Sequence, residues 1–582
     1  GCLSAVPWRP RHRSLDELSA LLAHRDRRVR MEAQFAIVDQ AFSKVEEDAD
    51  PNHARRVIGR LAQTAKRHTR QLARLHGIWG LGQIAARHPD ELKAIAGLLG
   101  DKDAEVRAQT AKVIGDAGYA GKNKTLISML GDKSARVRFF ASQSLGKLKA
   151  QEAATPLVEM IRDNADKDLY LRHAAVAALV RINNADALEA ASADPDASVR
   201  LAALLTLRRL NDGKIAGFLD DPDPLLVLEA ARAINDVPIN SALPQLAALA
   251  DNLERIASLE APAGVEIDLR TPLMLRVVNA NFRVGGARGA ETLAALAASE
   301  KALEKSRTEA LQALGSWERP HARDRIVGVY RPLQPRDSSI AAQSLKQCFD
   351  DILASAPVPV KLAAIQAAGS LKVQRVTPRI MQAALDSSAP PRVRAESLHA
   401  LGKLDENRLA LAVEKTISSG AALLRKTAVS YLGVLSKTKA LTALKGILAG
   451  ASIGEKQSAF AVLAKLAGPE AEAMIQEALD QLLAGKANAA LHLDILEAAE
   501  KRPEGAVKKK LNAYLASLPQ GDEVAPFHVA LHGGDVAAGR KVFLEKVEVA
   551  CIRCHKLKGK GGDVGPIQDG IGARHPRQYL LE

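Results

Sequence analysis

The chain has 582 residues, too many for one compact core, so its length excludes a single small domain and favours several domains or a repeat array. Aromatic residues make up only 3% of a composition that is 47% hydrophobic, which favours close-packed helices over sandwiches and barrels. Four cysteines exclude a disulfide framework, and no apolar run reaches the roughly 18 residues that a membrane helix needs.

The formal net charge of +14 would suit an acidic partner, an anionic surface or nucleic acid. No basic stretch is interleaved with aromatic residues, so we expect a solvated helical array with a Lys/Arg surplus and no nucleic-acid partner. Residues 1–13 begin with Gly and lack a signal-peptide pattern, and we expect them to be the lead-in of a fragment or a processed chain. Cys2 and Cys348 stand alone, and Cys348 is predicted to be a small core residue.

Residues 14–515 repeat one pattern, in which an apolar and a basic residue precede apolar positions at helical spacing. Examples are "DAEVRAQTAKVIGDAG", "SARVRFFASQSLGKLK" and "DASVRLAALLTLRRL". Successive clear copies lie 31, 34 and 28 residues apart, a period that fits two helices and two turns. The repeated basic residues are Arg30, Arg107, Arg138, Arg172, Arg200, Arg394 and Arg425, with weaker copies at Arg74, Arg276, Arg307, Lys361 and Lys456.

One such helical hairpin cannot bury both of its faces, so we expect the hairpins to stack on one another. Asp103 and Asp196 precede two of the Arg helices and are predicted N-caps. Small residues such as Ala111 and Ala141 would let neighbouring helices approach closely. The pattern resembles the HEAT-repeat family across residues 14–515, and this resemblance implies an all-α fold, a curved α-solenoid.

The repeated arginine could form a ladder that binds anions, or a ladder inside the array that bonds neighbouring aspartates and helix ends. We expect the internal ladder, because a packing role predicts repetition in every unit. The array contains no Ser/His/Asp arrangement, no H-E-x-x-H motif and no phosphate loop. The sequence therefore predicts a scaffold without a catalytic site, and it leaves open whether the whole protein is an enzyme.

The composition changes after residue 515, where the stretch "PQGDEVAPFHVALHGG" predicts a linker that we place at residues 516–532. Cys551, Cys554 and His555 then form C-x-x-C-H, the attachment pattern of c-type haem. Two thiols on one helical turn can add to the two vinyl groups of haem, and the adjacent imidazole can bind the iron. Haem c is therefore the predicted cofactor, and His555 is the predicted metal ligand.

Zinc is the alternative occupant of this motif. A structural zinc site needs four ligands, and the further candidates are His528, His532 and His575, at irregular spacing. With zinc bound, the chain would be a HEAT-repeat scaffold or adaptor with a protein or nucleic-acid partner. The segment "GKGGDVG" lacks a strict G-x-G-x-x-G and follows no predicted strand, so we expect a loop along the haem edge rather than a phosphate site.

Residues 533–582 resemble class I cytochromes c. The N-terminal helix of that family is matched by Gly534, Asp535, Gly539 and Phe543, and "GPIQDGIGAR" is similar to its G-P-x-L-x-G-x-x-x-R loop. Two features depart from the family: the spacing from Phe543 to the first cysteine is longer than in its shortest members, and Gln568 replaces the usual Leu.

This second resemblance implies roles for several residues near the motif. The carbonyl of Pro566 would fix the His555 ring through the nitrogen distal to the iron. Arg574 would help to hold a haem propionate, and Gly539 and Phe543 would pack against a C-terminal helix.

Cytochromes of this class take a Met as the sixth iron ligand, downstream of the attachment site. No Met follows the motif here, since the last one in the chain is Met474. We therefore expect residues 533–582 to form an incomplete haem domain whose sixth ligand lies outside this chain. His575, beside Pro576, is expected to be a surface residue rather than a ligand.

A HEAT array followed by such a domain resembles a group of bacterial multidomain cytochromes, in which a sugar-dehydrogenase-like β-propeller comes first. The resemblance implies that a dehydrogenase-like domain lies upstream of residue 1 and that this chain is the spacer and electron outlet. A redox protein is the expected partner, and lysines near the motif could attract an acidic one. Because thioether formation needs reduced thiols and a maturation system outside the cytoplasm, we expect a periplasmic or cell-surface location.

Overall fold

A computed structural model describes residues 13–42, 52–261, 264, 266–519, 524–546 and 549–582. Nearly all of the predicted lead-in, including Cys2, and part of the predicted linker lie outside these residues. The chain divides into two compact units, residues 1–284 and 285–582, and the boundary falls inside the predicted array. Each unit is described by itself.

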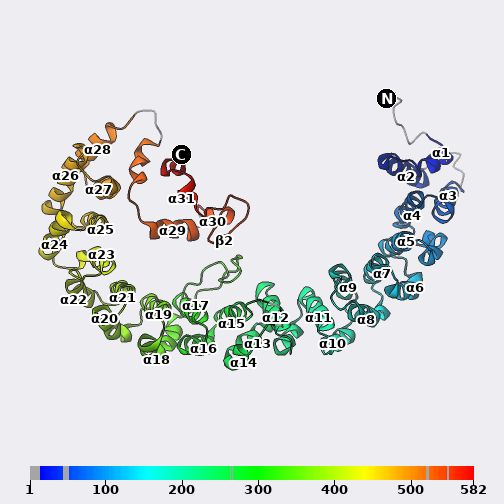
Figure 1. Cartoon of the computed structure of the whole chain (residues 1–582), viewed down its shortest axis with the longest axis horizontal. Coiled ribbons are helices and arrows are strands. Elements are labelled where there is room, and N and C mark those ends of the chain that lie inside the picture. The colour runs from blue at the N-terminus through cyan, green and yellow to red at the C-terminus, as the bar shows by residue number, and fades with distance from the viewer. Residues whose placement is uncertain (1–12, 43–51, 262–263, 265, 520–523, 547–548) are drawn as a thin grey trace. The chain divides into compact units, whose positions relative to one another are not determined.

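The first unit consists of stacked helical hairpins, coloured from blue to green in Figure 1. The second helix of each hairpin lies beside that of the next, so that α5, α7, α9 and α11 form one row. The first helices α6, α8 and α10 pack beside this row. The bounds are α1 (Leu15–Leu21), α2 (Arg27–Phe42), α3 (His53–Arg67), α4 (Gln71–Ala85), α5 (Ala104–Asp116), α6 (Asn123–Ser128), α7 (Ala135–Lys147), α8 (Ala154–Asn164), α9 (Leu169–Ile182), α10 (Ala185–Ser192), α11 (Ala197–Leu210), α12 (Pro224–Asp236), α13 (Leu243–Ala248), α14 (Leu253–Ala257) and α15 (Arg270–Val284).

The second unit continues the pattern, and α17, α19, α21, α23, α25 and α27 form its row of second helices. After α28 the chain forms a 3₁₀ turn, η13 (Ala525–Leu531), short helices and a two-stranded antiparallel hairpin, which the all-α prediction did not include. The bounds are α16 (Gly286–Ala298), α17 (Glu304–Gly315), α18 (Ser338–Ser355), α19 (Val358–Ser370), α20 (Thr377–Leu385), α21 (Pro391–Leu404), α22 (Glu406–Thr416), α23 (Ala422–Ser430), α24 (Lys437–Gly450), α25 (Ile453–Leu463), α26 (Pro469–Leu483), α27 (His492–Glu500), α28 (Ala506–Ala516), α29 (Val536–Glu545), α30 (Cys551–Cys554), β1 (Lys556–Leu557), β2 (Lys560–Gly561), α31 (Ile571–Arg574) and α32 (Arg577–Leu581).

Two local features explain the helix starts and the close stacking. The side chains of Asp103 and Asp196 accept backbone N–H groups of the first helical turn, at 2.8 Å in each case, which confirms the predicted N-caps. At Gly115 a Cβ atom would lie 2.5 Å from the Cα of Ser144 in the next hairpin, so only glycine permits this approach. Among the described residues, no helix is long and apolar enough to cross a bilayer.

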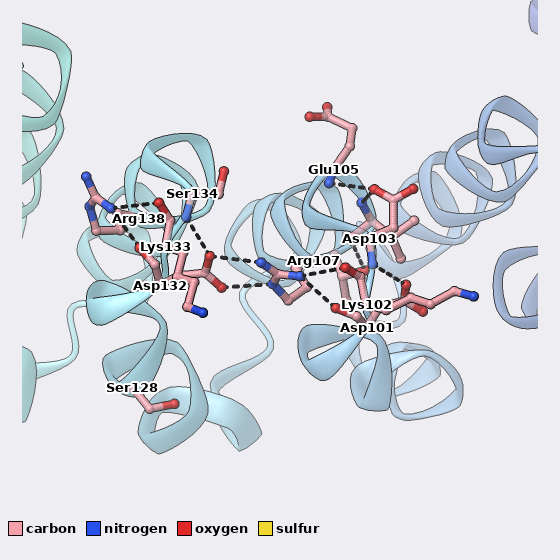
Figure 2. A network of polar contacts seen from close by, with 12 residues as sticks. Asp101, Lys102, Asp103, Glu105, Arg107, Ser128, Asp132, Lys133, Ser134 and Arg138 are labelled. Atoms are coloured by element: carbon pink, nitrogen blue, oxygen red, sulfur yellow. Dashed lines mark hydrogen bonds and ion pairs between the residues drawn. The ribbon is translucent and has the colours of Figure 1, made fainter.

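The repeated arginine bonds inside the array, as the sequence predicts (Figure 2). One guanidinium nitrogen of Arg107 donates to the carbonyl oxygens of Asp101 and Lys102, at 2.8 and 3.2 Å, and so caps the end of the preceding helical segment. Its Nε and Nη2 atoms donate to the carboxylate of Asp132 in the next hairpin, at 2.8 and 2.9 Å. The backbone carbonyl of Asp132 then accepts a hydrogen bond from Arg138, at 2.7 Å, and this carries the ladder one repeat further.

The same arrangement recurs in both units. Arg200 donates to the carbonyl of Asp194 and to the carboxylate of Asp221, and Arg425 donates to the carbonyl of Ser419 and to the carboxylate of Glu455. The donors of these arginines therefore serve neighbouring turns and repeats, which confirms the internal ladder over an anion-binding one. The weaker copies Arg74, Arg307 and Lys361 donate to nearby backbone carbonyls, Arg276 donates to the carboxylate of Asp236, and Lys456 lines a groove.

The ladder makes stability depend on pH. Burial alone would raise the pKa of Asp132, but hydrogen bonds from Arg107 and from the backbone N–H of Ser134 outweigh it and hold this pKa below its usual value. Such a carboxylate contributes stability above its unfolded pKa of about 4, and the contribution disappears as pH falls through the folded pKa. We expect the free energy of unfolding to fall below about pH 4, and to fall less in Asp132→Asn.

Urea unfolding at pH 7 and pH 3, followed by circular dichroism, measures this difference. Asp90→Asn is the matched control, because Asp90 forms a surface ion pair with Lys93 and its side chain is 83% exposed. An Asp132→Asn variant that loses as much stability in acid as the wild type would contradict the prediction.

Candidate functional site

The C-x-x-C-H segment forms a single helical turn, α30. Ala550 precedes it in the left-handed region, at φ 47°, and the backbone N–H of His555 closes it by donating to the carbonyl of Cys551, at 2.9 Å. Cys551 is half-buried, Cys554 is exposed, and both are free thiols. Because positions three apart on a helical turn share a face, the two sulfurs are available on one side of the turn.

A glycine-rich loop folds tightly against this turn. The backbone N–H of Gly565 donates to the carbonyl of Cys554, at 2.7 Å. A Cβ atom at Gly562 would lie 2.1 Å from the carbonyl oxygen of Arg553, and one at Gly565 would lie 2.8 Å from the ring of His555. The glycines therefore permit close packing around the predicted ligand, and this explains "GKGGDVG" without a phosphate site.

The loop is held by the hairpin of β1 and β2. Lys558 and Gly559 form its two-residue turn, with φ values of 49° and 75°, the geometry that suits a tight hairpin. The backbone N–H of Lys558 donates to the carboxylate of Asp569, at 2.7 Å, and that of Gln568 donates to the carbonyl of Lys556, at 2.9 Å. These contacts tie residues 566–569 to the hairpin and bring them beside His555.

The imidazole of His555 is held at one nitrogen only. Its Nδ1 atom lies 2.9 Å from the carbonyl oxygen of Pro566, the contact that the cytochrome resemblance implied. The side-chain nitrogen of Gln568 lies 2.8 Å from the same Nδ1 and donates to the Pro566 carbonyl, at 3.1 Å. No hydrogen bond among the described residues involves Nε2 of His555, so this atom can serve as a ligand to a metal.

Sequence reasoning treated Gln568 only as a departure from a family pattern. One sequence signal could have identified Gln568 as part of the site. It is a polar residue where the cytochrome pattern has Leu, and it lies two positions after Pro566, whose carbonyl was predicted to hold the His555 ring.

Other predicted residues lie near the motif with different contacts. Arg574 is exposed and donates to the carbonyl of Ile567, at 3.1 Å. His575 stacks on Tyr579, with ring centroids 4.0 Å apart. Among the described residues, no atom lies within 4 Å of a Cβ placed on Gly539, and the C-terminal helix α32 contacts η13. The packing of Gly539 and Phe543 against a C-terminal helix, which the resemblance implied, stays a prediction.

The C-terminal segment lacks a core of its own. Of the side chains that the structure describes from residue 526 to 582, none is buried. Large apolar side chains stay exposed there, although burial of apolar surface contributes about 25 cal/mol per Å². They are Phe527, Val536, Val542, Val549, Val564, Ile567, Tyr579 and Leu580.

These features fit a covalent haem. Two free thiols share one turn, the neighbouring imidazole keeps one nitrogen available, and the same C-terminal segment leaves large apolar side chains exposed. Structural zinc takes four ligands, and among the described residues no three His, Cys, Asp or Glu side chains form a metal-binding group.

A groove of about 800 Å³ lies among helices α24 to α27, and sequence reasoning did not identify it. Its lining alternates lysines with two glutamates over an apolar floor. The residues that define it include Leu441, Lys445, Lys456, Phe460, Glu470, Met474, Glu477, Lys486 and Ile495. The mixture of charges favours no one class of ligand.

Comparison with known proteins agrees with the fold. Residues 91–180 match the family model of HEAT repeats, and no curated protein matches the chain. Crystal structures of Kap121p bound to Ste12p, to Pho4p and to RanGTP are similar, with TM-scores of 0.44, 0.42 and 0.43 and sequence identities of 16%, 16% and 14%. The matches cover 88%, 87% and 88% of this chain and 55% of each Kap121p chain, so this chain spans about half the length of those proteins.

The stacked hairpins and the internal arginine ladder define an α-solenoid. Within this solenoid, residues 91–180 match the HEAT-repeat family.

Proposed function

We propose that this chain is a HEAT-repeat scaffold that carries a covalent c-type haem and serves as the electron outlet of a larger dehydrogenase-like protein. The observation that carries the proposal is the arrangement at residues 551–555, where two free thiols flank one turn and, among the described residues, the adjacent imidazole forms hydrogen bonds at Nδ1 and none at Nε2. A bound haem would supply a one-electron carrier, with iron alternating between the ferric and ferrous states.

The residues of the turn have separate roles in this proposal. Each thiol, of Cys551 and of Cys554, would add across one vinyl group, with sulfur bonding to one carbon and the proton going to the other, so the attachment would need no oxidant. His555 would hold the iron through Nε2. The Pro566 carbonyl, 2.9 Å from Nδ1, would then accept a hydrogen bond from Nδ1–H and so orient the ring. Arg574, which is exposed, is available for a propionate.

Covalent attachment is tested by expressing the chain with a secretion signal and a c-type haem maturation system. We expect intact-mass spectrometry to find the polypeptide plus one haem, and a haem stain to persist on a denaturing gel. Two unmodified thiols would show that the proposal is wrong, and equimolar zinc without visible absorbance would support the zinc-binding scaffold instead.

The coordination of the iron gives a further prediction. No Met follows His555, and His575 is stacked on Tyr579. We expect the haem-loaded chain to be five-coordinate or weakly ligated, and its reduced form to bind carbon monoxide, seen as a shift of the main absorption band. His575→Ala should bind carbon monoxide equally. A stable low-spin, Met-ligated spectrum of the wild type would contradict the prediction.

The partner is proposed to be a redox protein with an acidic surface. Lys558 and Lys560 are exposed beside the motif, and among the described residues neither is in an ion pair, whereas Lys556 pairs with Asp563. Since c-type maturation takes place outside the cytoplasm, the proposed location is the bacterial periplasm or cell surface.

A further inference from the structure

Three polar groups meet on the side of the His555 ring that faces away from the proposed iron. The Nδ1 atom lies 2.9 Å from the Pro566 carbonyl and 2.8 Å from the Gln568 amide nitrogen. The amide is 3.1 Å from the same carbonyl, and the backbone of Gln568 is anchored to Lys556. Gln568 is half-buried, so its side chain is held against the ring rather than moving freely in solvent.

The ring proton decides which way this amide faces. In a neutral imidazole one nitrogen carries the proton and the other accepts. When Nε2 carries it, Nδ1 accepts from the Gln568 N–H group, as the 2.8 Å contact describes. When Nε2 binds iron, the proton must sit on Nδ1, and two donors would then face each other. A half-turn of the amide removes this conflict, because it places the side-chain oxygen of Gln568 against Nδ1–H. The amide then gives up its N–H bond to the Pro566 carbonyl, and the two oxygens share the one Nδ1 proton.

We propose that Gln568 is a positioning residue for His555, whose amide oxygen becomes a second acceptor for Nδ1–H, beside the Pro566 carbonyl, once the ring binds iron. The proposal rests on the proposed haem function.

A second acceptor draws the Nδ1 proton away from the ring and makes Nε2 a stronger electron donor. This favours ferric over ferrous iron, because a stronger electron donor stabilises the more highly charged ion. One electron enters the iron on reduction, and the proton stays on Nδ1 in both states. Gln568 should therefore lower the reduction potential of the haem.

The test uses the full haem-loaded chain and its Gln568→Leu and Gln568→Glu variants, each first shown by mass spectrometry to carry one haem. In Gln568→Leu the acceptor is lost, and we expect the ferric-to-ferrous equilibrium to move about tenfold toward ferrous, measured as a rise in midpoint potential by spectroelectrochemical titration. In Gln568→Glu a charged acceptor strengthens the bond, and we expect the potential to fall below that of the wild type.

Val564→Glu is the matched charge control, because Val564 lies in the same loop and is 88% exposed. It should shift the potential less than Gln568→Glu. Resonance Raman spectra of the ferrous protein give a second readout, in which the iron–histidine stretch should move to lower frequency in Gln568→Leu.

Equal potentials and equal stretches in Gln568→Leu and the wild type would overturn the role of Gln568 while the haem function stands. A wild-type chain without covalent haem would overturn both, so the two failures are distinguishable.

Discussion

Replacing both motif cysteines, in Cys551→Ser/Cys554→Ser, should abolish covalent haem attachment completely. The thioether bonds are made by these two sulfurs, and a serine hydroxyl does not form them. After maturation in the periplasm, we expect no haem stain on a denaturing gel and an intact mass equal to that of the polypeptide alone. Each single variant should keep one thioether, with an altered absorption spectrum.

Cys348→Ser is the matched control for this result. Burial raises the pKa of Cys348 to about 11, so at neutral pH it is a protonated thiol within α18, with little reactivity. This variant should retain full haem. Helical content by circular dichroism should be unchanged in the double variant, because none of the described side chains in that segment is buried. Covalent haem in the double variant would refute the attachment site.

Arg200→Ala should lower the free energy of unfolding by about 3 to 5 kcal/mol, the range found when one partner of a buried ion pair is removed. Arg200 and Asp221 are each only 9% exposed, and their two hydrogen bonds measure 2.8 and 3.0 Å. The variant leaves the Asp221 carboxylate buried without its cation. It also uncaps the carbonyls of Asp194 and Pro195, which Arg200 contacts at 2.8 and 3.0 Å.

Two further variants distinguish the effect of leaving a buried charge unpaired from the effect of losing a charge at the surface. Arg136→Ala breaks the ion pair with Glu105. Because the Arg136 side chain is 57% exposed, this change should lower the free energy of unfolding by less than about 1 kcal/mol. Arg200→Met/Asp221→Leu removes both buried charges and should recover most of the loss. Urea unfolding followed by circular dichroism measures the free energy of unfolding of all three variants. The first transition is compared, because a long repeat array need not unfold in one step. A loss for Arg200→Ala as small as that for Arg136→Ala would contradict the ladder's role in stability.

The local patterns of the sequence were enough to predict the repeat and its internal ladder. These patterns are the spacing of the arginines, the aspartates before the helices and the small residues within them. Each involves residues close in sequence, where backbone geometry dictates which groups can meet. Asp103 as an N-cap and Arg107 as a donor to the helix end before it follow directly from such short separations. The C-x-x-C-H motif is local in the same sense.

Contacts between distant segments depended on the tertiary structure. The carboxylate that receives Arg107 lies 25 positions further along the chain, and Gln568 reaches His555 only because a hairpin and a glycine-rich loop fold back on the motif. The sequence alone thus determined the helical repeat, the positions of its arginines and the C-x-x-C-H motif. The tertiary structure decided which carboxylate each arginine pairs with and which side chain contacts the proposed iron ligand, because these contacts depend on how separate segments pack.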